Sequence, residues 1–121
     1  MLSVALQTTL ENIITNTFMV IGDEDIDAPF CFHEEQQRPV FLKKGVAGYE
    51  YDCEVAIIAD LPDSVEALKQ QVITAIESLK ATTVEGTGIE EIEYLGDAPG
   101  YDAESKLYIS IIRFLIQTSN I

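Results

Sequence analysis

The feature that most constrains this chain is a strand that runs straight into a helix. From Tyr49 to Ile58, apolar residues alternate first with acidic residues and then with other apolar ones. This period of two predicts a β-strand that begins half-exposed and ends buried on both faces. Beyond Pro62, apolar residues recur every three or four positions from Val65 to Leu79. That spacing predicts a helix of about five turns that packs one side on a sheet.

Other stretches predict the remaining elements. Leu2, Leu6, Leu10 and Ile13 are spaced as on one helix face, which predicts a helix over residues 2–16. Short apolar runs predict strands at 30–33, 40–42 and 89–95, and a long strand at 107–116. The last strand is apolar on both faces, which indicates an interior strand or an edge buried against a partner.

Breaker residues predict the connections. Gly and Pro, together with polar residues, predict loops at Gly22–Pro29, Glu34–Arg38 and Gly96–Glu104, and a flexible connection over 82–88. A turn is expected at 43–45, and Gly48 is expected to form a bend or bulge. At the start of the long helix, Asp63 or Ser64 is the expected cap.

Length and composition complete the fold prediction. The chain has 121 residues, of which 47% are hydrophobic and 23% charged, a globular composition of single-domain size. We therefore predict one α+β domain spanning residues 1–121. Its mainly antiparallel sheet of four to five strands carries two helices packed on one face.

The charge balance excludes several classes of partner. Asp and Glu number 21 against 7 Lys and Arg, a net charge of −14. A nucleic-acid backbone or an anionic membrane surface requires a basic footprint, so neither is an expected ligand. The sequence has no apolar run of membrane-spanning length and no signal-peptide pattern, so we expect a cytoplasmic protein. Cys31 and Cys53 are then expected to be reduced core thiols.

The acidic stretch before the first predicted strand has the spacing of a calcium loop. Asp23, Asp25 and Asp27 alternate, and Glu34 occupies the twelfth position. Ala28 stands where the sharp turn of such a loop needs glycine, and the flanks look extended. A solvated acidic loop is the preferred interpretation.

One strand also carries residues able to bind zinc or to act in catalysis. Cys31 and His33 share a strand face, and Cys53 and Glu34 could complete a zinc site, although no paired ligand spacing supports one. A small enzyme or ligand-binding domain would depend on His33, Cys31 and Glu54. Further carboxylate pairs, Glu90 with Glu91 and Asp97 with Asp102, follow from the abundance of acid, and Gly86-Thr87-Gly88 lacks the lysine of a phosphate loop. We therefore predict that no residue of the chain is catalytic and that none binds a cofactor or a metal.

Taken as a whole, the chain resembles the tail-completion, or tail-terminator, proteins of long-tailed phages and prophages. The resemblance covers nearly the full length and rests on pattern. Its parts are the helix Leu2 to Asn16, the segment Pro39-Val40-Phe41, the strand Tyr49 to Ala59 leading into the helix Ser64 to Leu79, the acidic loop Gly96 to Glu104, and the final strand that begins Lys106-Leu107-Tyr108.

The resemblance implies a structural assembly protein rather than an enzyme. Proteins of that family fold as an α/β sandwich and form a ring, usually a hexamer, that stops tail-tube growth and meets the head connector. It implies as partners other copies of the chain, the tail-tube protein and the head–tail connector, with DNA passing through the ring without specific binding. It also implies a place in the bacterial cytoplasm during assembly and in the virion tail afterwards.

Two alternatives stay open at this point. One is another head–tail connector or neck protein of similar size. The other is a small cytoplasmic α+β enzyme or ligand-binding domain. The negative charge would repel DNA phosphates in a ring lumen, or it would simply keep the free subunit soluble. The three predicted loops are the candidate contacts with the ring and the tube.

Overall fold

A computed structural model describes residues 2–14, 17–18, 28–42, 45–84 and 86–119 of the chain. It confirms the α+β class. In chain order the elements are α1 (Leu2–Glu11), β1 (Thr17–Phe18), β2 (Phe30–Leu42), β3 (Gly45–Ala59), α2 (Pro62–Glu77), β4 (Thr82–Val84), β5 (Thr87–Asp102) and β6 (Leu107–Ser119).

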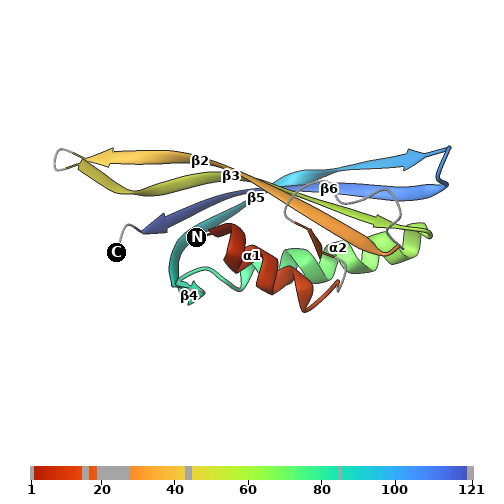
Figure 1. The fold of residues 1–121 in the computed structure, drawn as a ribbon, viewed down its shortest axis with the longest axis horizontal. Coiled ribbons are helices and arrows are strands. Elements are labelled where there is room, and N and C mark those ends of the chain that lie inside the picture. The colour runs from red at the N-terminus through yellow and green to blue at the C-terminus, as the bar shows by residue number, and fades with distance from the viewer. Residues whose placement is uncertain (1, 15–16, 19–27, 43–44, 85, 120–121) are drawn as a thin grey trace.

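The strands within these ranges all lie in one sheet, in the order β1-β2-β3-β6-β5-β4. The five strands from β2 to β4 are antiparallel, while the two-residue β1 pairs parallel to β2 at one edge. Both helices lie on the same side of the sheet (Figure 1). The long β6 lies between β3 and β5, which confirms the prediction of an interior strand.

The core lies between the helices and one face of the sheet. Every second residue of β3 and β6 points into it, and the apolar stripes of α1 and α2 close it from the other side. Its fully buried members include Leu2, Leu6, Leu10, Val55, Ile57, Val72, Ile76, Ile112, Phe114 and Ile116. The period-two and period-3.6 patterns therefore placed the apolar residues on the correct faces.

Two long hairpins extend past the helix layer. β2 with β3 and β5 with β6 project at opposite ends of the molecule (Figure 1). On β3 the alternation ends as the sequence predicts, because Ala56 and Ile58 are buried along with their odd-numbered neighbours.

The structure corrects three predicted connections. Glu34–Arg38 is not a loop, because β2 is one continuous strand through Pro39. Most of Gly96–Glu104 belongs to β5, which passes Gly96 and Pro99 and ends at Asp102. Most of the predicted 82–88 connection is also strand, because 82–84 form β4 and 87–88 begin β5. Proline and glycine suggested breaks, but both strands border only one long neighbour, and a strand edge tolerates them.

The predicted helix cap is also wrong. Leu61 occupies the N-cap position of α2 and no side chain caps it, while Pro62 begins the helix as expected. The expected irregularity at Gly48 is confirmed, because the β2–β3 register shifts between Val40 and Phe41 and passes over one residue of β3. A Cβ at Gly48 would lie 2.2 Å from the Thr118 carbonyl oxygen, so β6 approaches too closely for a side chain there.

Candidate assembly surface

His33 is a buried part of the scaffold that ties α1 to the sheet. The residue is 1% exposed, with Nδ1 2.5 Å from Glu35 Oε1 and Nε2 2.7 Å from Gln7 Oε1. The Gln7 amide nitrogen donates to Thr17 O at 2.7 Å and to Glu11 Oε1 at 2.5 Å. The two amide hydrogens thus serve Thr17 and Glu11. The amide oxygen carries no hydrogen, so it accepts from His33 Nε2. Residues from α1, β1 and β2 are thereby joined in one hydrogen-bonded cluster.

This arrangement gives His33 a structural position. Both ring nitrogens are hydrogen-bonded within the protein, and the ring is buried, out of contact with solvent. Glu35, its carboxylate partner, is itself almost fully buried, with 7% of its side chain exposed. The cluster fixes where the first helix sits against the sheet.

The two cysteines are buried thiols on the helix-facing side of the sheet. Cys31 is fully buried, and its Sγ lies 3.2 Å from Thr17 Oγ1. Burial raises the pKa of the Cys31 thiol, and it raises the pKa of Cys53 far above the ordinary range. A nucleophilic cysteine needs the opposite environment, exposed and electropositive. Both thiols are free, with no disulfide between them.

The zinc ligands considered from sequence do not come together. Glu34 lies on the sheet face opposite to Cys31 and His33, because neighbouring strand residues alternate. Within the described ranges, no three His, Cys, Asp or Glu side chains gather closely enough to hold a metal ion. The calcium-like acids Asp23, Asp25 and Asp27 lie outside the described residues.

Of the carboxylate pairs considered from sequence, Asp97 and Asp102 lie on opposite faces of the sheet. Asp97 lies on the helix side, where its carboxylate is 3.3 Å from Lys69 Nζ and accepts from the Tyr94 hydroxyl at 3.2 Å. The carboxylates of Glu66 and Asp97 raise the pKa of Lys69. The contact between Lys69 and Asp97 ties α2 to β5. Asp102 lies in a row of the opposite face and binds Ser105. Neither arrangement has the geometry of a general acid and base.

The surface that remains is the sheet face turned away from the helices. Its residues form transverse rows with a common character across four strands. Two rows are apolar and three are polar; they run Phe30-Ile58-Ile109-Gly100, Phe32-Ala56-Ile111-Ala98, Glu34-Glu54-Arg113-Gly96, Gln36-Asp52-Leu115-Glu93 and Arg38-Glu50-Gln117-Glu91. An apolar band and an acidic band therefore lie side by side on this face.

Ion pairs neutralise only part of the acidic band. Arg38 binds Glu50 at 2.5 Å and also Asp52, and it lowers the pKa of Glu50. Arg113 lies 3.7 Å from Glu54. A shallow hollow of about 200 Å³ opens between Glu34, Gln36, Asp52, Glu54 and Arg113. Exposed pairs of this kind contribute little stability, so their interest lies in the surface potential they leave.

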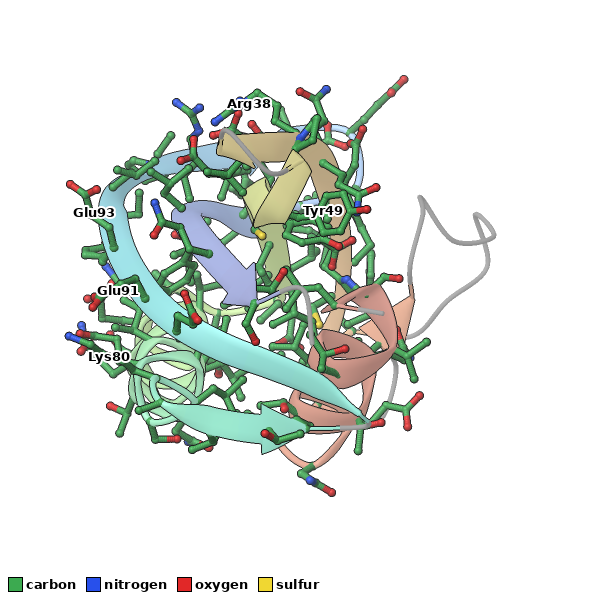
Figure 2. All side chains as sticks on the ribbon, turned by 90° about the vertical axis from the view of Figure 1, so that its left-hand side faces the viewer. Arg38, Tyr49, Lys80, Glu91 and Glu93 are labelled. Atoms are coloured by element: carbon green, nitrogen blue, oxygen red, sulfur yellow. The ribbon has the colours of Figure 1, made fainter. Side chains whose placement is uncertain are left out.

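Figure 2 shows how the ends of the acidic band lie apart. Arg38, on β2, is at the top of this view, while Glu91 and Glu93 line the outer side of β5. Glu91 is next to Lys80, the last basic residue before β4, and their charged atoms are 3.2 Å apart.

The predicted contact loops have different outcomes. Of Gly22–Pro29, only residues 28 and 29 lie within the described residues. Glu34–Arg38 and most of Gly96–Glu104 are strands at the two sides of the sheet rather than loops. The acidic and apolar rows could not be predicted from these segments, because each row is assembled from four strands that lie far apart in the chain. The alternation within each strand was the one available signal.

Comparisons with known proteins give a fold likeness. No protein-family model matches the chain, and no curated protein does either. Among solved structures it is similar to a chain in the "Virion of native gene transfer agent (GTA) particle", with a TM-score of 0.79 and 12% sequence identity. The match covers 98% of this chain and 95% of that one. Neither helix in the described part of the chain is long and apolar enough to span a bilayer.

Proposed function

We propose that this protein is a structural component of a phage-like virion, and specifically a tail terminator that forms a ring at the end of the tail tube. The observation that carries this proposal is the fold likeness to a virion chain over almost the whole of both chains. It accords with the tail-terminator resemblance of the sequence. The proposed partners are other copies of this chain, the tail-tube protein and the head–tail connector.

The geometry supports assembly better than catalysis. The single histidine of the chain is buried and hydrogen-bonded on both nitrogens, and both thiols are buried. The broad face left uncovered by the helices carries acidic residues in ordered rows. If this face lines a ring lumen, its negative charge keeps DNA from adhering to the wall as it passes. We therefore propose a non-enzymatic role in the virion, with assembly in the bacterial cytoplasm.

The experiment is to follow the protein by size-exclusion chromatography with light scattering at rising concentration, and by negative-stain electron microscopy. We expect rings whose mass is a small multiple of the 13.4 kDa subunit, about sixfold for a hexamer. Co-expression with the tail-tube protein of the same virus or prophage should place the ring at tube ends. Binding to the connector but not to tubes would instead favour the alternative, another neck protein. A monomer that joins neither would refute a virion role.

A further inference from the structure

The sheet has two long strand edges that no described strand covers, one at each side. β1 pairs only with residues 31 and 32 of β2, so the edge from His33 onward lies open in the described part of the chain. On the other side β4 pairs with residues 87–89 of β5, and the edge from Glu90 to Asp102 is open within the same limits. Open edges carry unpaired N–H and C=O groups and are templates for another strand.

The two edges have directions that suit each other. β2, β3, β6 and β5 alternate in direction across the sheet, so β2 and β5 run antiparallel. A second copy placed with its β2 against this β5 continues the same alternation. Contacts of this head-to-tail kind use two different surfaces of each subunit and close into a ring when the rotation allows.

Two prolines identify which backbone groups face outward. Pro39 is paired with Tyr49, but proline has no N–H, and the Tyr49 carbonyl points toward β6, where Thr118 Oγ1 lies 3.5 Å away. The backbone of Pro39, and by alternation that of Glu35 and Gln37, therefore faces the open edge. On β5, Pro99 is paired with Ser110 and likewise has no N–H, so its backbone also faces the open edge. On both edges the outward groups belong to residues of the helix-facing side.

Charge then selects one register. With the transverse rows continued from one copy to the next, Arg38 lies beside Glu91 and Gln36 beside Glu93, while Glu35 lies beside Tyr94. This alignment sets no two carboxylates opposite each other on either face.

The neighbouring registers are worse. A slip of two residues one way sets Glu34 against Glu93, and the opposite slip sets Glu35 against Asp97. Like charges directly opposite each other destabilise a strand pair. A slip of one residue would turn every side chain to the wrong face.

We propose that the open edge of β2 pairs antiparallel with the open edge of β5 in a second copy of this chain, in the register that sets Arg38 against Glu91. This inference deepens the proposed function, on whose ring it rests, by naming the interface. The apolar and acidic bands of successive subunits then run on continuously, so the acidic band becomes an uninterrupted collar.

Disulfide trapping tests this interface. Within one chain, positions 38 and 91 are separated by β3 and β6, hence by about 14 Å, too far for a disulfide. In the doubly substituted Arg38→Cys, Glu91→Cys chain, oxidation should therefore give a ladder of covalent oligomers on a non-reducing gel. The single variants should not form a ladder, and mixing them should give dimers. Arg38→Cys with Glu93→Cys is the register control and should cross-link less.

A backbone variant tests the same edge without cysteine. Gln37→Pro removes an outward N–H while leaving the ladder to β3, whereas Gln37→Thr loses the same side-chain bond to Tyr51 but keeps the N–H. We expect Gln37→Pro alone to abolish the oligomer, with an unchanged unfolding transition of the monomer.

Each other result overturns the inference. Rings that persist in Gln37→Pro, rings that give no ladder, or a preference for the Glu93→Cys partner would all contradict the proposed pairing. If the protein still forms rings at the ends of tail tubes in any of those cases, the proposed function holds although the edge pairing does not. A protein that is monomeric throughout overturns the edge pairing, and its binding to tail tubes then decides separately on the virion role.

Discussion

Replacing Gln7 by methionine should loosen the first helix from the sheet. The side chain is similar in size and equally suited to a helix, but it can neither donate to Thr17 O nor accept from His33 Nε2. A buried polar group left without its partner costs about 1–3 kcal/mol, and here an imidazole N–H and a carbonyl oxygen both lose one. We expect a loss of about 2–4 kcal/mol, a large part of the roughly 5–15 kcal/mol that stabilises a domain.

The assay is equilibrium unfolding in urea, at a protein concentration where the subunit is monomeric, because assembly would add its own stabilisation. With an ordinary denaturant slope the midpoint should fall by about 1–2 M, and the slope itself should not change. Thr8→Met is the matched control, since Thr8 is exposed on the same helix and should tolerate the change. If Gln7→Met unfolds within about 0.5 kcal/mol of the parent, the hydrogen-bonded cluster does not hold the helix as described.

Three further outcomes follow from burial and close contact. Since burial raises the pKa of both Cys31 and Cys53, neither thiol should react with a thiol reagent at mildly alkaline pH in the native protein, and both should react in denaturant; native-state labelling at the rate of a free thiol would contradict this. Gly48→Ala should destabilise the protein by about 1–3 kcal/mol, because its methyl group would meet a carbonyl oxygen of β6, whereas Gly100→Ala, with nothing nearer than 4.0 Å, should have little effect on the melting temperature. Phe114→Ala, at the centre of the core, should cost about 3–5 kcal/mol in urea unfolding, and a loss below 1 kcal/mol would mean that the core is not packed around this ring.

Most of the fold could be predicted from periodicity. The alternation in β3 and the three-and-four spacing in α2 each reflect burial on one face, and burial is what the structure shows. The extended stretches of β2 and β5 were missed because Pro39, Gly96 and Pro99 are typical of turns. Such residues also occur at strand edges, and only the tertiary arrangement reveals that these strands have one open side.

The surroundings of the candidate residues were harder to predict. The sequence singled out His33 only as a candidate ligand or catalytic residue, because its partner Gln7 lies 26 residues earlier, on a helix whose position depends on the whole core. Glu34 could be excluded as a partner of Cys31 and His33 once β2 was known to be continuous, because alternation then places it on the other face. Nothing in the sequence indicated that α2 lacks a side-chain cap, because Asp63 and Ser64 are both residue types that commonly cap helices.

The central place of β6 has a consequence for how the polypeptide acquires its structure. This strand joins the two halves of the sheet, yet it follows all the other described strands in chain order. During synthesis, β3 has no neighbour on its inner side until β6 leaves the ribosome, and β5 has only the short β4. We therefore expect folding to be slow and all-or-none, since pairing β3 with β6 must close a loop of about 50 residues or more.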